Sequence, residues 1–336
     1  MEPTGPPSPR SRGLPPAVIA LTRGFPPYAR PFSPAVLMGR DSLLGERLSP
    51  SLQAYLSNVR PPDKNSPAGR SGAGIPLTPP KEETAGEDPF AVPAVVYLAE
   101  EVTSTFDLAW KLLETDALPP WGAVLAARQT EGRGQYRRSW QSLAGNLHLT
   151  FRLPEGANPG GGAASVLTGY LLASAFRRLG FPLSLKWPND LLLGDRDKVG
   201  GILLEERGGI LLAGVGINLA HAPRPEDLRR KAATPAGTLF GDRGEERFPS
   251  PFALWRSLVG AAIVEYTRNV AHRGLSEILA DLVPLLAWRN SPVIVTDGGD
   301  TRISGLYVGI GPEGDLLLRL DTGEIRSLHG GSLSRP

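Results

Sequence analysis

The chain has 336 residues, of which 41% are hydrophobic and 21% charged, and its formal net charge is +2. This balance is typical of an ordinary globular protein and lacks the basic excess of a nucleic-acid-binding protein. The absence of cysteine excludes disulfides, thiolate nucleophiles and zinc–thiolate sites. Apolar runs are far shorter than a membrane span and the first ten residues lack a signal-peptide pattern, so we expect a cytoplasmic protein without a membrane partner.

The first 90 residues differ in composition from the rest of the chain. Eighteen of the 34 prolines lie there, and neither a period of two nor one of 3.6 is sustained. This composition predicts a poorly ordered extension over 1–90, in which short apolar patches such as 17–21 could dock locally. No helix-turn-helix pattern is visible upstream. A folded body is expected over 91–289, followed by a strand-rich tail over 290–336.

Apolar periodicity predicts the elements of the folded body and the tail. The expected strands of the body are 95–99, 122–128, 146–153, 183–187, 190–193, 199–207 and 209–219. The expected helices are 104–114, 163–179, 251–272 and 275–289. The tail has strand-length segments at 293–296, 302–310, 314–320 and 324–328, which suit a small barrel. Ser104 or Thr103 is expected to cap the first helix, Gly180 to end the second, and Gly208-Gly209 to form a hairpin turn.

A glycine-rich loop at 129–140 carries three arginines directly after an expected strand. Glycines let the backbone approach a phosphate or carboxylate closely, and arginine supplies a forked set of donors that stays charged. The loop is therefore a candidate anion site. The alternative is an ordinary solvated basic loop.

Two lysines mark a second segment, 186–190 followed by 198–205. Only six of the 36 basic residues are lysines, so Lys186 and Lys198 in one short β-rich stretch favour a role that arginine would not fill. An ammonium group can sit between a carboxylate oxygen and an α-phosphate, and Asp190 offers a hard oxygen ligand for magnesium. The alternative is a turn in which Pro188 interrupts the strand.

The third segment, 214–219, reads Gly-Val-Gly-Ile-Asn-Leu at the end of an apolar strand. It lacks the third glycine and the following helix of a dinucleotide-binding fingerprint, so a plain core strand with small residues is the simpler interpretation. A P-loop is excluded because the chain contains no Gly-Lys dipeptide. ATP, if used, must bind by another scheme.

Taken in order, these segments resemble the signature of the biotin protein ligase family. The shared motifs are the Gly-Arg-Gly loop, Lys-Trp-Pro-Asn-Asp, Lys-x-x-Gly-Ile-Leu-x-Glu and Gly-x-Gly-x-Asn, with a Ser-Thr pair at 104–105 and a closing segment at 330–335. The resemblance implies an α+β fold, with a mixed sheet and flanking helices like the catalytic core of class II aminoacyl-tRNA synthetases. It also implies a small C-terminal SH3-like β-barrel.

The resemblance also implies roles for individual residues. Lys198 and Arg133 would be catalytic, facing the biotin carboxylate and the α-phosphate. The residues implied at biotin are Ser104, Thr105, Phe106, Gln129, Arg133, Gly134, Gln135 and Lys198. Those implied at ATP are Arg133, Arg138, Lys186, Asn189, Asp190 and Asn218, with Asp190 also holding Mg²⁺. Trp140 is expected to pack, and 221–238 resembles a loop that orders over the adenylate.

By this resemblance the chain activates biotin with ATP and transfers it to a lysine of a biotin carboxyl carrier protein. A homodimer is left open, and neither a nucleic-acid partner nor repressor activity is predicted. The alternatives are a lipoate or octanoate ligase or transferase of the same fold, and a biotin-binding protein without catalysis. Gln135 and Arg137 stand where the family commonly shows arginine and glycine, which predicts weaker retention of the adenylate.

Overall fold

The computed structural model describes residues 18–21, 95–227, 234–240, 250–297 and 301–336. Apart from residues 18–21, the extension expected over 1–90 lies outside the described residues. The expectation that it contains no helix-turn-helix therefore stays a prediction. Those four residues form strand β1 (Val18–Leu21), which pairs in parallel with β2 (Val96–Val102) at one edge of the central sheet.

The central sheet has eight strands in the order β1-β2-β3-β4-β8-β7-β6-β5. The further strands are β3 (Ala123–Gln129), β4 (Leu147–Arg152), β5 (Leu183–Lys186), β6 (Asp190–Leu193), β7 (Asp197–Arg207) and β8 (Ile210–Ile217). β1, β2 and β3 pair in parallel, and the remaining pairs are antiparallel. The sheet is therefore mixed, as expected, and the expected strands of the body are present with slightly shifted ends.

Two glycine signals act as the sequence predicts. Gly208 and Gly209 have φ values of 57° and 79° and join β7 to β8. A two-residue hairpin turn needs positive φ angles at both residues if its twist is to match that of the flanking strands. Glycine adopts such angles at little cost. Gly180, with φ of 85°, follows the helix α3 (Gly161–Arg178) and ends it.

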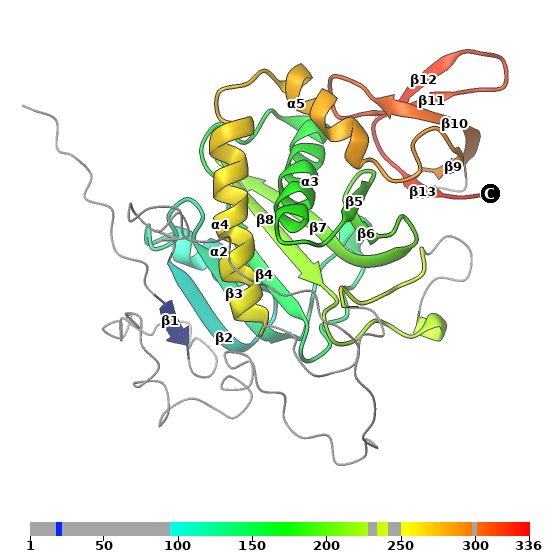
Figure 1. The fold of residues 1–336 in the computed structure, drawn as a ribbon. Coiled ribbons are helices and arrows are strands. Elements are labelled where there is room, and N and C mark those ends of the chain that lie inside the picture. The colour runs from blue at the N-terminus through cyan, green and yellow to red at the C-terminus, as the bar shows by residue number, and fades with distance from the viewer. Residues whose placement is uncertain (1–17, 22–94, 228–233, 241–249, 298–300) are drawn as a thin grey trace, which may run out of the picture.

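Helices cover both faces of the sheet (Figure 1). α3 and α4 (Pro251–Asn269) share one apolar core with the strands, whereas α2 (Thr105–Leu113) packs with β2, β3 and β8 in a separate core on the other face. Ser104 caps α2, and Ser250 caps α4 by accepting a hydrogen bond from the backbone N–H of Ala253 at 3.1 Å. In the described part of the chain, no helix is both long enough and apolar enough to cross a membrane.

The expected helix over 275–289 is wrong in its second half. α5 ends at Leu282 (Leu275–Leu282), and a 3₁₀ turn, η3, follows over Val283–Leu285. Pro284 has no N–H for the helical hydrogen-bond ladder and its ring crowds the preceding turn, which accounts for the early end. Two further 3₁₀ turns, η1 (Gln135–Arg137) and η2 (Pro225–Asp227), lie in loops.

The tail forms a five-stranded antiparallel sheet in the order β12-β11-β10-β9-β13. Its strands are β9 (Pro292–Thr296), β10 (Arg302–Ile310), β11 (Leu316–Arg319), β12 (Ile325–Leu328) and β13 (Ser332–Ser334). The small C-terminal β domain expected from the glycine turns is thus present, and β13 is a strand that the periodicity did not predict.

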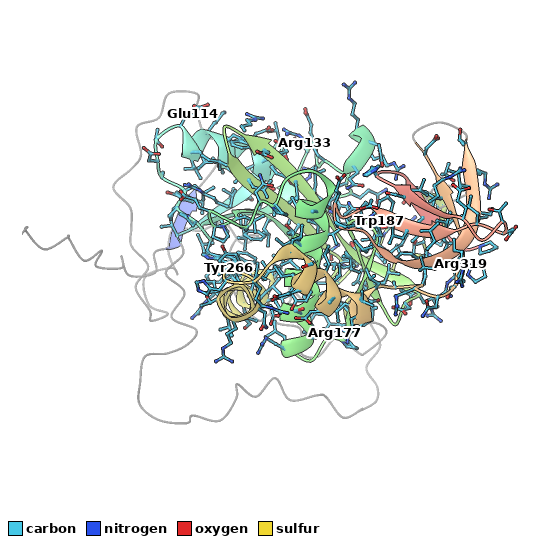
Figure 2. All side chains as sticks on the ribbon, turned by 90° about the horizontal axis from the view of Figure 1, so that it is seen from above. Glu114, Arg133, Arg177, Trp187, Tyr266 and Arg319 are labelled. Carbon is cyan, nitrogen blue, oxygen red and sulfur yellow. The ribbon has the colours of Figure 1, made fainter. Side chains whose placement is uncertain are left out.

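The C-terminal sheet packs against the central domain through a common core. Side chains of β9 to β11 and β13 share this core with α3, α5 and the end of β5. Trp187 lies at this junction (Figure 2), and its indole N–H donates to the carbonyl of Gly314 at 2.8 Å. The segment that carries Lys186 therefore contacts both domains.

Glu265 gives a test of the packing between α3 and α4. Its side chain is buried and accepts hydrogen bonds from Tyr170, Arg178 and Asn269 at 2.8 to 2.9 Å. Glu265→Ala would leave these donors without their acceptor, so we expect a loss of about 3 kcal/mol in the free energy of unfolding, measured by urea denaturation. Glu101→Ala breaks the exposed pair with Arg128 and should cost less than about 1 kcal/mol.

His148 on β4 gives a test of pH dependence. Burial lowers its pKa from 6.5 to about 4, a hydrogen bond with the Leu143 carbonyl opposes this, and Nδ1 has no partner among the described residues. Because the folded pKa is depressed, the unfolded chain binds the extra proton between pH 6.5 and 4. The free energy of unfolding should fall by up to about 3 kcal/mol as the pH drops through this window.

The measurement is urea denaturation at several pH values, compared with His148→Gln. Glutamine can keep a donor near the Leu143 carbonyl but does not titrate, so its stability curve should be flatter over this window. An equal slope in both proteins would assign the pH dependence to other groups.

Candidate active site

One cavity of the described structure lies between the central sheet, α2 and the C-terminal sheet. All but one of the expected site residues line it: Ser104, Thr105, Phe106, Gln129, Arg133, Gly134, Gln135, Arg138, Lys186, Asn189, Asp190 and Lys198. The exception is Asn218, just beyond β8, whose amide nitrogen donates to the Gly237 carbonyl at 3.1 Å. Three segments far apart in sequence therefore meet in one place.

The glycines of β8 make room for two aromatic rings. A Cβ on Gly214 would lie 2.4 Å from the ring of Phe106, and one on Gly216 would lie 2.4 Å from the ring of Trp140. Both distances are far below van der Waals contact, so any side chain at these positions would displace a ring. The Gly-x-Gly pattern thus shapes the cavity floor, and Trp140 packs on β8 as expected.

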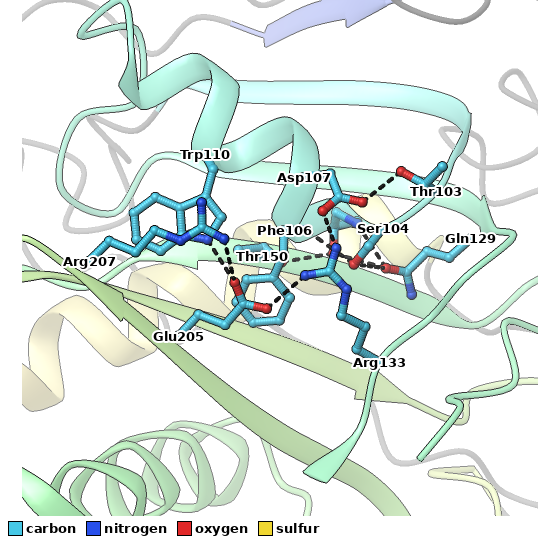
Figure 3. Close-up of polar contacts among 11 residues, drawn as sticks. Thr103, Ser104, Phe106, Asp107, Trp110, Gln129, Arg133, Thr150, Glu205 and Arg207 are labelled. Atoms are coloured by element: carbon cyan, nitrogen blue, oxygen red, sulfur yellow. Dashed lines mark hydrogen bonds and ion pairs between the residues drawn. The ribbon is translucent and has the colours of Figure 1, made fainter. Parts of the chain in front are cut away.

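Ser104, Thr105 and Gln129 form one hydrogen-bonded group at the start of α2, and Figure 3 labels Ser104 and Gln129. The Gln129 Oε1 atom accepts from the Thr105 N–H at 2.9 Å, from its hydroxyl at 3.1 Å and from the Ser104 hydroxyl at 3.5 Å. The hydroxyls of Thr105 and Thr150 lie 2.8 Å apart. Ser104 and Thr105 are buried. This group offers fixed donors and acceptors at one end of the cavity.

Arg133 lies between two carboxylates (Figure 3). One terminal nitrogen, Nη1, donates to Glu205 at 2.9 Å, and the other, Nη2, bonds Asp107. Asp107 also accepts from the Thr103 hydroxyl at 2.7 Å, while Glu205 accepts from the Trp110 indole at 2.8 Å. The contacts hold the glycine-rich loop against α2 and β7. Arg133 therefore has two anionic partners within the chain itself.

Lys186, Asp190 and Lys198 form a compact charged cluster at the other end of the cavity. The ammonium groups lie 3.0 Å and 2.6 Å from the two oxygens of Asp190. Burial would raise the pKa of Asp190, but the attraction of Lys198 and Lys186 holds it below its ordinary value. Burial lowers the pKa of Lys186, and Asp190 opposes this. One negative and two positive groups leave a formal charge of +1, which suits an anionic ligand.

The residues 234–237 run beside the Lys198 end of β7. The backbone of Lys198 donates to the Pro235 carbonyl at 2.7 Å and accepts from Gly237 at 2.9 Å. The Thr234 hydroxyl accepts from the ammonium of Lys186 at 2.7 Å. These residues belong to the expected adenylate loop over 221–238, of which 228–233 lie outside the described residues. The described part therefore contacts both lysines of the cluster.

Sequence reasoning missed several residues that shape the site. Asn146 is fully buried, and its side-chain oxygen accepts from three successive N–H groups, Leu219 to His221, at 2.9 to 3.1 Å. It therefore fixes the chain just after β8. Tyr136, Gly331, Ser332 and Leu333 also line the cavity. No periodicity marks such single contacts, although the closing segment 330–335 was part of the observed resemblance.

Both the central domain and the C-terminal sheet resemble known proteins. Residues 98–221 match the Biotin/lipoate A/B protein ligase family, and residues 290–335 match the Biotin protein ligase C terminal domain. A biotin protein ligase from Aquifex aeolicus, solved in complex with biotin and ATP, has a TM-score of 0.57 and 25% sequence identity. The match covers 71% of this chain and 97% of that one.

Two curated relatives extend the comparison. The bifunctional ligase/repressor BirA of Escherichia coli is 32% identical over 225 residues, which are 63% of this chain and 65% of that protein. The biotin--[acetyl-CoA-carboxylase] ligase of Paracoccus denitrificans is 32% identical over 208 residues, which cover 58% of this chain and 83% of that ligase. The chain therefore belongs to the biotin protein ligase family.

Proposed function

We propose that this chain is a biotin ligase, which forms biotinyl-adenylate from biotin and ATP and transfers the biotinyl group to a lysine of a carrier protein. The observation that carries the proposal is that one cavity holds the hydrogen-bonded group of Ser104, Thr105 and Gln129 at one end and the Lys186, Asp190 and Lys198 cluster at the other. A ligand with a polar uncharged ring and an acidic tail matches this polarity.

The uncharged end suits the fused rings of biotin. A ureido group needs both donors and acceptors, and the hydroxyls of Ser104 and Thr105 with the amide of Gln129 supply both kinds. The side chains of Phe106, Leu149 and Val215 line the same cavity and offer apolar contact. Because these polar groups already bond one another, little reorganisation is needed when a ligand replaces part of the network.

The charged end suits the meeting of a carboxylate with a triphosphate. A biotin carboxylate oxygen attacks the α-phosphorus, and the bond to pyrophosphate breaks with its electrons leaving on pyrophosphate. In this proposal Lys186 and Lys198 face the negative charge that builds, and Asp190 fixes both ammonium groups in advance. Fixed cations in a partly dry site stabilise the transition state without waiting for solvent to reorganise.

The Gly-Arg-Gly loop closes the cavity between these ends. Arg133 has three N–H groups left after bonding Asp107 and Glu205, so it can face a ligand carboxylate without leaving its partners. Asn189 donates to the Ile202 carbonyl at 2.6 Å and holds the nucleotide-side segment on β7. In this proposal Asn189, which lines the cavity, also contacts ATP, whereas Asn218 lies outside the lining and positions the backbone.

Magnesium fits the charged end only if phosphate oxygens of the nucleotide supply further ligands. Asp190 is the only carboxylate among the cavity-lining residues, and the described residues include no group of three or more metal-ligating side chains. Mg²⁺ commonly uses one or two carboxylates together with phosphate oxygens and water. Asp190 would hold the ion, which would neutralise charge on the phosphates when bound.

In the second step the acceptor lysine attacks the carbonyl of the adenylate. The amide bond forms, AMP leaves with the electrons of the acyl–oxygen bond, and the amine proton passes to solvent. Biotin carboxyl carrier protein is the acceptor class that we propose, in keeping with the names of the relatives. No covalent intermediate on this chain is required, which agrees with a chain that has no cysteine.

The function is tested by incubating the full chain with ATP, Mg²⁺ and either biotin or lipoate. We expect the acyl-adenylate and pyrophosphate to form with biotin, followed by labelling of a carrier-protein lysine. An adenylate formed from lipoate alone would replace the proposal with the lipoate alternative. Binding of biotin with no pyrophosphate release would replace it with the non-catalytic one.

Lys198→Ala should reduce adenylation by at least about a hundredfold, because loss of one well-placed charge costs roughly 3 kcal/mol in the barrier. The backbone bonds of Lys198 remain, so the thermal unfolding temperature should change little. Pyrophosphate release measures the effect. Lys111→Ala, which removes an exposed lysine from α2, is the matched control and should keep the full rate. Normal turnover in Lys198→Ala would remove this residue from the mechanism.

Gln135→Arg should slow the release of biotinyl-adenylate by about fivefold, because a charged donor holds a phosphate more firmly than a neutral amide. Release is followed after preloading with labelled biotin and ATP. Gln141→Arg adds the same charge at an exposed position outside the cavity and should leave release unchanged. Equal effects of the two substitutions would show a general influence of charge rather than a contact of residue 135.

A further inference from the structure

We propose that Tyr136 is a positioning residue that ties the glycine-rich loop to the C-terminal sheet and so retains the adenylate; this inference rests on the proposed function. The Tyr136 hydroxyl accepts a hydrogen bond from the backbone N–H of Gly331 at 2.9 Å. The two residues are 195 positions apart and both line the cavity. The tie therefore joins two walls of the site that come from different domains.

Burial does not explain the position of Tyr136. Its side chain is 51% exposed, which makes it one of the two large hydrophobic residues at the surface of the described structure. An exposed ring gains little from the hydrophobic effect, so its place must come from specific contacts. The structure offers two such contacts: the hydroxyl bond to Gly331, and the guanidinium of Arg138, which lies 5.2 Å from the ring centre.

The backbone on both sides of the tie is in an unusual conformation. Tyr136 and Arg137 have φ values of 56° and 58°, in the left-handed region that most side chains avoid. Gly331 has a φ of 135°, and a Cβ there would lie 2.8 Å from Val295. Such conformations persist where surrounding contacts hold them. The hydroxyl bond connects the two segments at the point where each is most constrained.

The tie acts on the ligand through the loop. Gly134 donates to the Arg138 carbonyl at 2.8 Å, Arg138 donates to the Gln135 carbonyl at 3.2 Å, and Arg133 bridges Ser139 in a short antiparallel contact. These bonds make 133–139 a single unit. Holding the unit at Tyr136 therefore holds Gly134, Gln135 and Arg138 over the cavity, next to Ser332 and Leu333 of β13.

In this proposal a bound adenylate leaves when the loop and the C-terminal sheet separate. Tyr136→Phe removes only the hydroxyl and keeps the ring under Arg138. We expect labelled biotinyl-adenylate to leave the full chain about fivefold faster, equivalent to roughly 1 kcal/mol for one hydrogen bond. Without an acceptor protein, steady-state pyrophosphate release should rise with it, because each further turnover waits for the adenylate to leave. Tyr136→Ala, which also removes the contact with Arg138, should release the adenylate faster still.

Tyr266→Phe is the matched control, because it removes a hydroxyl bond of 3.0 Å to the Glu155 carbonyl away from the cavity. It should leave adenylate release unchanged. Release from Tyr136→Phe at the normal rate, or a loss of catalytic rate without faster release, would overturn the proposal.

A second readout does not depend on catalysis. In the ligand-free chain, hydrogen–deuterium exchange of peptides covering 132–140 and 329–334 should be faster in Tyr136→Phe than in the unmodified protein, because the Gly331 amide loses its acceptor. Unchanged exchange in both peptides would refute the tie. If the unmodified chain forms no adenylate, the proposed function fails, while this measurement still decides whether Tyr136 couples the two domains.

Discussion

The arrangement of the site depends on one carboxylate shared by two ammonium groups. Lys186 and Lys198 would repel each other in a partly buried cavity, and Asp190 lies between them at 3.0 Å and 2.6 Å. The attraction that keeps Asp190 ionised also keeps both cations fixed and leaves a net positive charge. Without this group, the end of β5, the start of β6 and the start of β7 would have no electrostatic reason to meet at this point.

The cluster is connected to both domains. Lys186 lies beside Trp187, whose indole bonds the Gly314 carbonyl of the C-terminal sheet, and its ammonium is 5.2 Å from the ring of Trp288. Backbone bonds of Lys198 hold residues 234–237 along β7. A change in the C-terminal sheet can therefore reach the charged end of the cavity through packed side chains and short hydrogen bonds. The small domain also contributes Gly331, Ser332 and Leu333 to the cavity lining directly.

The floor of the cavity depends on steric fit. The rings of Phe106 and Trp140 occupy the space that side chains on Gly214 and Gly216 would fill. The sequence interpretation of this strand as a plain core strand was correct for its burial but incomplete, because the glycines serve the surface of the pocket. A close approach of this kind involves residues more than 70 positions apart, and no local period reports it.

The sequence by itself determined the mixed order of strands and helices, the hairpin at Gly208 and Gly209, the end of α3 and a set of site residues of which all but Asn218 line the cavity. These features follow from local rules of periodicity, capping and turn chemistry, supplemented by the ordered set of motifs. Only the tertiary structure decided which partners those residues have: Arg133 between two carboxylates, Asn146 under the chain after β8, and Tyr136 against Gly331. Such pairings depend on how segments far apart in the chain pack together, and a local sequence pattern does not predict these contacts.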